Sequence, residues 1–135
     1  MAGIQQMYSG KKLLVTGTTG FVGKCVLEKL LRDVPDLDTV YILIRPKKNV
    51  SPQQRAVNEI STSPIFDRIK MHVENFEEFF VSKVVALAGD ICKDDMGLSP
   101  EDLSKVFSGV HFIINCAANV DFNERIDGAI TTNCR

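Results

Sequence analysis

The fold of this chain is decided by one stretch near its start, Leu13-Leu14-Val15-Thr16-Gly17-Thr18-Thr19-Gly20-Phe21-Val22-Gly23. An apolar run leads into glycines spaced three residues apart, and an amphipathic helical pattern then continues to Arg32. Strand, glycine-rich turn and helix in that order form the first unit of a nucleotide-binding α/β sheet. A glycine-rich turn that binds nothing is the alternative, and the order of the elements counts against it.

The glycines of this loop have different predicted tasks. Gly17 permits a tight exit from the strand, Gly20 lets the backbone approach a pyrophosphate, and Gly23 lets the helix pack close to the sheet. The amino terminus of the helix directs free N–H groups and its positive dipole end towards the anion. We therefore expect the cofactor to contact the whole loop, namely Gly17, Thr18, Thr19, Gly20, Phe21, Val22 and Gly23.

Further apolar runs at 40–44, 84–88 and 111–116 have the continuous β-branched character of strands that are covered on both faces. A second helix is predicted from the Ser99 cap and Pro100 to Phe107, ending before Gly109. The alternation predicts an α/β fold, a Rossmann-like doubly wound parallel sheet with right-handed crossovers.

The segment between the second and third strands, residues 45–83, is longer than an ordinary loop. A helix over 52–60 with Ser51 as its cap is expected there, followed by short helices over 64–69 and 76–81. Residues 125–135 read as a helix that is still running at the last residue, and a complete doubly wound sheet has more strands. We therefore expect residues 1–135 to be one domain that is incomplete at its carboxyl end.

The choice of dinucleotide depends on the carboxyl end of the second strand, where the ribose lies. Asp36 and Asp38 have the spacing of an NAD-type acid but precede that strand. Arg45, which follows it, offers a charged planar fork to a 2′-phosphate, with Lys47 and Arg55 as weaker helpers. The alternative is a solvated basic turn. The prediction is an NADP(H)-binding domain.

Two further segments complete the predicted site. Asp90 and Ile91 follow the third strand, where the carboxylate is placed to accept from an adenine amino group or simply to cap a turn. After the fourth strand, Ala117, Ala118 and Asn119 provide small side chains where the backbone passes the cofactor ribose, or where it is merely packed closely.

Composition excludes several other classes. The formal net charge is −1, which gives no sign of a nucleic-acid surface. The 4 cysteines are scattered without a C-x-x-C pair, and His72 and His111 are far apart with no close Cys/His grouping, so we expect neither a disulfide framework nor a metal site. No secretory signal and no apolar run of about 20 residues is present, so this portion is expected to lack a membrane segment.

With these motifs in place, the sequence resembles the extended short-chain dehydrogenase/reductases and, within them, the fatty acyl-CoA reductases with their male-sterility-type NAD(P)-binding domain. The resemblance rests on the glycine loop and on 28–32, 41–47, Arg55, Ser63-Pro64-Ile65-Phe66-Asp67-Arg68, 88–91 and Asn115-Cys116-Ala117-Ala118-Asn119-Val120-Asp121-Phe122-Asn123-Glu124. It implies an oxidoreductase of lipid metabolism that reduces long-chain acyl-CoA to a primary fatty alcohol with two hydrides from NADPH.

The resemblance also implies that the chain is an amino-terminal fragment. The catalytic Tyr-x-x-x-Lys pair of the family is expected beyond residue 135, so the fragment alone is expected to be inactive. Neither Tyr8 nor Tyr41 is expected to replace the tyrosine, and Asn133 corresponds to an asparagine that supports the active site. An intracellular location, at peroxisomal or endoplasmic reticulum membranes for the full-length protein, is implied as well.

Three alternatives stay open at this point. A carrier-protein thioester reductase shares most of these motifs. An NADP-dependent sugar-nucleotide epimerase or dehydratase shares the glycine loop, although the long helical insertion argues against it. A non-catalytic nucleotide-binding module is the third.

Overall fold

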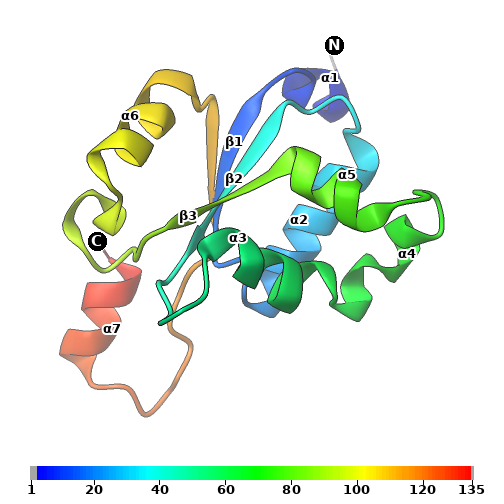
Figure 1. Cartoon of the computed structure of the whole chain (residues 1–135). Helices are drawn as coiled ribbons and strands as arrows, with labels where there is room; N and C mark the ends of the chain where they lie inside the picture. The colour runs from blue at the N-terminus through cyan, green and yellow to red at the C-terminus, as the bar shows by residue number, and fades with distance from the viewer. Residues whose placement is uncertain (1–2, 135) are drawn as a thin grey trace.

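A four-stranded, all-parallel sheet forms the centre of the computed structural model, which describes residues 3–134 (Figure 1). Its strands are β1 (Lys12–Thr16), β2 (Thr39–Ile44), β3 (Val84–Ala88) and β4 (Phe112–Asn115), in the spatial order β3-β2-β1-β4. The predicted strands are confirmed to within one residue at each end. The order reverses between β1 and β4, and the crevice at such a reversal is where open α/β sheets bind ligands.

One face of the sheet is covered by the helices that precede and follow β2. They are α2 (Phe21–Asp33), α3 (Pro52–Arg55), the π-helix η1 (Ala56–Ser61), η2 (Pro64–Phe66), α4 (Asp67–Lys70) and α5 (Phe76–Lys83). Leu13 and Val15 point into this layer, where the rings of Phe66 and Phe80 lie 6.0 Å apart. The helix predicted over 52–60 is present, but it widens to a π-helix after Arg55.

The opposite face carries a smaller core. Leu14, which lies between Leu13 and Val15 in β1, packs there with Leu87 of β3 and with Val106 of α6 (Pro100–Gly109). This alternation is the period of two that a strand requires when both faces are covered. Figure 1 shows α6 on the side of the sheet away from α2 and α5, as a doubly wound fold requires. At the edge strand β4, Ile113 is 64% exposed.

Three elements differ from the sequence predictions. A short helix α1 (Ile4–Tyr8) and a 3-10 turn η3 (Asp94–Gly97) were not predicted. The helix expected to run through residue 135 is α7 (Ile126–Asn133), and it ends because Cys134 leaves the helical conformation. Arg135 lies outside the described residues. Helix α6 includes Gly109, two residues past Phe107, where the predicted helix ends.

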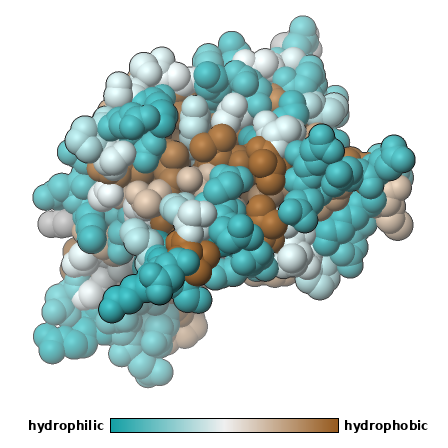
Figure 2. Space-filling model, in the orientation of Figure 1, coloured by the Kyte–Doolittle hydropathy of each residue, from teal (hydrophilic) through white to brown (hydrophobic). Residues whose placement is uncertain are grey.

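The surface seen in Figure 2 has apolar atoms near its middle, over β3 and its neighbours, with hydrophilic residues around them. Val85 of this edge strand is among the exposed large hydrophobic residues. No helix within residues 3–134 is both long enough and apolar enough to cross a membrane.

Candidate nucleotide-binding site

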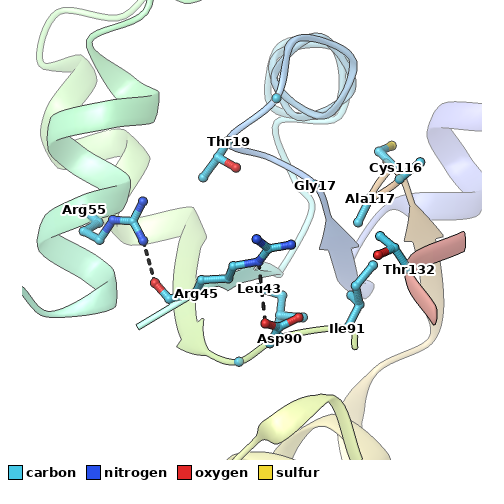
Figure 3. A pocket seen from close by; sticks show the side chains of 13 residues that line it. Gly17, Thr19, Leu43, Arg45, Arg55, Asp90, Ile91, Cys116, Ala117 and Thr132 are labelled. Carbon is cyan, nitrogen blue, oxygen red and sulfur yellow. Dashed lines mark hydrogen bonds and ion pairs between the residues drawn. The ribbon is translucent and has the colours of Figure 1, made fainter. Parts of the chain in front are cut away.

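A cleft of about 420 Å³ lies at the carboxyl edge of the sheet (Figure 3). It is lined by residues that follow each of the four strands, together with one residue each of β2, α3 and α7. The lining residues are Gly17, Thr19, Gly20, Leu43, Arg45, Arg55, Gly89, Asp90, Ile91, Cys116, Ala117, Ala118 and Thr132. The fold therefore gathers candidates from all four predicted segments into one place.

The glycine loop after β1 has no room for side chains at two of its positions. Gly17 has a φ of +71°, and a Cβ there would lie 2.6 Å from the backbone nitrogen of Ala117. A Cβ at Gly23 would lie 2.8 Å from the Cα of Thr18 and closer still to the carbonyl of Gly17. Gly23 thus lets α2 approach the loop itself, whereas its predicted task was an approach to the sheet.

Gly20 is different, because the protein itself does not require it to be glycine. A Cβ at Gly20 would lie 3.3 Å from the carbonyl oxygen of Gly17, which is a tight contact but a looser one than those at Gly17 and Gly23. The space beside Gly20 belongs to the cleft. A bare backbone at this position is what the close approach of a pyrophosphate needs.

The exits of β1 and β4 are joined by hydrogen bonds. The Thr16 hydroxyl donates to Oδ1 of Asn115 and accepts from the backbone N–H of Ala117 at 3.3 Å. These bonds hold the glycine loop against the segment after β4. They fix the walls of the crevice at the point where the strand order reverses.

Arg45 and Asp90 face each other across the floor of the cleft (Figure 3). The Arg45 side chain is 69% exposed, and its Nε lies 3.6 Å from Oδ2 of Asp90. The other oxygen of Asp90 accepts from the Cys92 backbone N–H at 2.9 Å. That hydrogen bond, with the charge of Arg45 as a weaker cause, lowers the pKa of Asp90. Asp90 therefore caps a turn and also lines the cleft.

The other two predicted basic residues are engaged with a carboxylate. Arg55 donates from Nε and Nη2 to the two oxygens of Glu59, at 3.0 and 2.7 Å, and from Nη1 to the carbonyl oxygen of Arg45. Lys47 lies 3.9 Å from the same carboxylate and outside the cleft lining. Among the described residues, the Arg45 side chain has only the long ion pair with Asp90, so it is the cation that is available to a phosphate.

Several predicted contact residues lie off the cleft. Phe21 is 74% exposed and, with Val22, lines a separate apolar groove between α1 and α2, because these side chains project from the outer side of the helix. Thr18 is fully buried, and its hydroxyl has no hydrogen-bond partner within residues 3–134. Any cofactor contact of these three residues stays a prediction.

Asn133 of α7 holds the segment after β4. Its side chain accepts from the backbone N–H of Asn119 at 2.8 Å and donates to the carbonyl oxygen of Asn119 at 3.0 Å. Asn119 is outside the cleft lining, although its neighbour Ala118 is within it. The two hydrogen bonds attach α7 to this segment, and a role of Asn133 in supporting the active site stays a prediction.

Sequence reasoning missed Leu43, Gly89, Cys116 and Thr132 as lining residues. Gly89 carried a signal, since it stands between the third strand and Asp90. A Cβ at Gly89 would lie 2.6 Å from the Met96 carbonyl oxygen. Thr132 carried none, because only the fold brings α7 to the cleft.

Tyr8 cannot be set aside as the catalytic tyrosine on its sequence spacing, and its place in the fold decides. Tyr8 does have a lysine, Lys12, four residues further on, so spacing alone does not exclude it as a catalytic pair. The structure places the two residues at the amino end of β1, opposite the glycine loop. There the Tyr8 ring lies 5.1 Å from that of Phe112, and Lys12 pairs with Asp38 at 3.8 Å. The spacing is therefore that of a packing residue and a surface ion pair.

Comparison with known proteins agrees with this geometry. Residues 15–135 match the model of the NAD(P)-binding family described as male sterility protein. The chain belongs to this family. It is a fatty acyl-CoA reductase homologue: it is 40% identical to mouse fatty acyl-CoA reductase 1 over 133 residues and 37% identical to the chloroplastic fatty acyl-CoA reductase 2 of Arabidopsis thaliana over 134. Each match covers 98% of the chain, which spans 25% and 22% of these relatives.

Solved structures support the fold. The terminal R domain of the myxalamid PKS-NRPS pathway aligns with a TM-score of 0.70 at 26% identity, covering 93% of this chain and 29% of that one. The reductase domain of a Mycobacterium tuberculosis non-ribosomal peptide synthetase aligns at 0.63 and 26%, covering 84% and 26%. The NADPH-bound carbonyl reductase from chicken fatty liver shares the fold at a TM-score of 0.54 and 19% identity, over 93% of this chain and 43% of that one.

No group of histidine, cysteine, aspartate or glutamate side chains within residues 3–134 is arranged to hold a metal ion. The cleft does fit a dinucleotide, since its glycine cradle leaves the backbone bare at Gly20 and an exposed arginine stands at the ribose end.

Proposed function

We propose that this homologue supplies the NADPH-binding part of an enzyme that reduces long-chain acyl-CoA to a primary alcohol. The observation that carries the proposal is the identity of 37 to 40% to fatty acyl-CoA reductases across 98% of the chain. The named activity of those relatives is a reduction of acyl-CoA, and the cleft supplies what a reduced dinucleotide needs.

NADPH is favoured over NADH by the charges at the carboxyl end of β2. Arg45 offers its fork there, while Asp36 and Asp38 lie at the opposite end of the strand. The Ser9 hydroxyl donates to Asp36, which lowers the pKa of that carboxyl, and Asp38 pairs with Lys12. Because both acids lie at the amino end of β2, neither is placed to accept a hydrogen bond from a ribose hydroxyl at the carboxyl end.

The residues of this chain bind and orient the cofactor, and they do not supply the proton donor. The bound dinucleotide supplies hydride, and the loop from Gly17 to Gly23 holds its pyrophosphate at the start of α2. Asn133 keeps the segment after β4 in place beside the cleft. Proton donation to the carbonyl oxygen is assigned to a Tyr-x-x-x-Lys pair outside this chain, because Tyr8 and Lys12 lie at the wrong end of β1.

A chimaera tests the proposal directly. Residues 3–134 replace the matching quarter of mouse fatty acyl-CoA reductase 1, and oxidation of NADPH is followed with palmitoyl-CoA. We expect NADPH-dependent alcohol formation by the chimaera and none by the 135-residue chain alone, because loss of a positioned general acid costs about 10²- to 10⁴-fold. Turnover by the chain alone would overturn the assignment of the catalytic pair, and a folded chimaera that fails to bind NADPH would overturn the proposal.

A carrier-protein thioester reductase is the second candidate, favoured by the alignment with the myxalamid R domain. The lower identity of 26%, against 40% for mouse fatty acyl-CoA reductase 1, places it second. A reciprocal chimaera with the myxalamid R domain separates the two. We expect the acyl-CoA reductase chimaera to be the more active, because the exposed residues of β4 and α7 must fit the downstream half.

For the compartment, we propose peroxisomal or endoplasmic reticulum membranes on the family resemblance. One relative, the fatty acyl-CoA reductase 2 of Arabidopsis thaliana, is named chloroplastic, so a plastid is the alternative compartment. Imaging of the tagged full-length protein tests the proposal, and a plastid signal would overturn it.

A further inference from the structure

The guanidinium of Arg55 lies between two groups near the carboxyl end of β2, which is where the ribose of a bound dinucleotide is expected. One is the carboxylate of Glu59, which takes two hydrogen bonds from Arg55, and the other is the carbonyl oxygen of Arg45, which takes a third. Figure 3 shows Arg55 reaching from its helix to the backbone of Arg45, whose own guanidinium extends over Asp90. We call Arg45, Arg55 and Glu59 the ribose-end triad.

Burial divides the tasks within the triad. The Arg55 side chain is only 15% exposed, and three of its five N–H donors are engaged by the contacts above. Arg45, at the surface, has its guanidinium free of such bonds to the described residues. Arg55 lines the cleft, but a half-buried arginine that is bound to a carboxylate and a backbone carbonyl acts on its neighbours more than on a ligand.

The negative charge of Glu59 is unfavourable to a bound phosphate unless a cation compensates it. It stands beside Lys47 and Arg55, the residues that sequence analysis assigned to the phosphate. Its pKa is lowered, first by the hydrogen bonds of Arg55 and then by neighbouring positive charges, so it is ionised at neutral pH. Glu59 lies outside the cleft lining, but its carboxylate is bonded to Arg55, which lines the cleft, so an unpaired charge there would repel a 2′-phosphate through space.

From this arrangement we infer that Arg55 is a positioning residue that sets the preference for NADPH. It neutralises Glu59 and fixes the Arg45 carbonyl, which leaves Arg45 as the direct phosphate ligand. The inference rests on the proposed NADPH site. It differs from the sequence prediction, in which Arg55 is itself a helper on the phosphate.

A double-mutant cycle on the 135-residue chain tests this role. The variants are Arg55→Met, Glu59→Gln and the two combined, and dissociation constants for NADPH and NADH are measured by cofactor fluorescence. We expect Arg55→Met to weaken NADPH about tenfold with little change for NADH, and Glu59→Gln to leave NADPH binding at wild-type strength or better. The double variant should regain much of the loss, because the exposed negative charge is gone.

The chain contains a matched control in Arg32 and Glu28, another arginine and glutamate four residues apart with a hydrogen bond of 2.8 Å. This pair lies towards the far end of α2 from the glycine loop. Arg32→Met should lower the melting temperature about as much as Arg55→Met, because it also leaves a carboxylate unpaired, but it should not change the ratio of the two dissociation constants.

The results separate the inference from the function on which it rests. A wild-type chain that binds NADPH and NADH equally would overturn the NADPH site, before any variant is considered. A double variant as weak as Arg55→Met alone would show that Arg55 does not act by masking Glu59, and would overturn the inference. If Arg55→Met does not fold, Glu59→Gln still decides, because a loss of NADPH affinity in that variant contradicts the masking of Glu59.

Discussion

The two faces of the sheet differ in how completely the chain covers them. On the face under α2 and α5, buried aliphatic and aromatic side chains, among them Leu13 and Phe80, form a filled core. On the other face, Leu14, Leu87 and Val106 are the only members of the buried cluster among the described residues. Large apolar side chains stay exposed towards that side and the carboxyl end, among them Phe107, Ile113, Val120, Phe122, Ile126 and Ile130.

The difference shows where the stability and the function of this chain come from. The core under α2 and α5 holds β1, β2 and the glycine loop in place, so the part of the cleft that these segments form is supported by a filled core. The other half, formed by the segment after β4 and by α7, is held mainly by hydrogen bonds such as those of Asn133. We therefore expect association of the chain to involve this side of the sheet.

The largest expected effect comes from emptying the filled face. Phe80 is fully buried and its ring lies 5.9 Å from that of Phe76, so Phe80→Ala removes an aromatic side chain from the centre of the core. We expect a loss of about 3 to 5 kcal/mol in the free energy of unfolding, which is enough to unfold a marginal domain. Urea denaturation followed by circular dichroism measures it. The control Ile113→Ala, on the open side, should cost about 0.5 kcal/mol or less.

A second prediction separates the glycines of the loop. Gly23→Ala places a methyl group against the backbone of Thr18 and should cost about 1 to 3 kcal/mol of stability, since backbone cannot give way as a side chain can. Gly20→Val should leave the fold almost intact and abolish NADPH binding, because its side chain fills the space of the pyrophosphate. Calorimetry and cofactor titration measure the two effects. A folded Gly20→Val chain with an unchanged dissociation constant would show that the loop is only a turn.

The sequence predicts the filled half better than the open half, for physical reasons. Each strand is an apolar, β-branched run bounded by glycine, proline or aspartate, so its position follows from composition. The helix α1 is too short to show a period, since only Ile4, Met7 and Tyr8 are apolar. A π-helix cannot be foreseen from Ala56–Ser61, because apolar spacing does not separate i+4 from i+5 bonding.

The site shows the same division. Gly17, Arg45 and Asp90 were found because each stands at a strand exit, and strand exits of a parallel sheet meet at one edge. The spacing of Arg55 and Glu59 is visible in the sequence as an i,i+4 pair. The hydrogen bond from Arg55 to the Arg45 carbonyl is not, because it joins a helix to a strand exit through backbone.

A third prediction concerns Arg45, the residue proposed to bind the 2′-phosphate. Arg45→Ala should weaken NADPH selectively by about 1.5 to 3 kcal/mol, or one to two decades in affinity, because it removes a charge-assisted contact with the 2′-phosphate. Lys47→Ala is the matched control, since Lys47 is similarly exposed but faces Glu59. Titration with NADPH and NADH measures both variants. Equal losses for the two cofactors in Arg45→Ala would contradict the assignment.

The smallest effect on stability, and the sharpest test of the comparison, comes from polar substitutions on the open side. Ile113→Thr keeps a β-branched side chain on the edge strand, and Phe122→Ser removes a fully exposed ring, so together they should change the free energy of unfolding by about 0.5 kcal/mol or less. They should nevertheless reduce self-association of the chain, because exposed apolar surface beside an edge strand drives it.

Sedimentation velocity across a range of concentrations measures that association. The control is Phe21→Ser, which removes an exposed ring from the apolar groove between α1 and α2, on the other side of the molecule from α6. We expect this control to associate nearly as the wild type does, because the groove is bordered by Lys29 and carries no strand edge. If Phe21→Ser dissociates the chain while Ile113→Thr with Phe122→Ser does not, the groove is the sticky surface, and the contrast between the two faces of the sheet does not govern association.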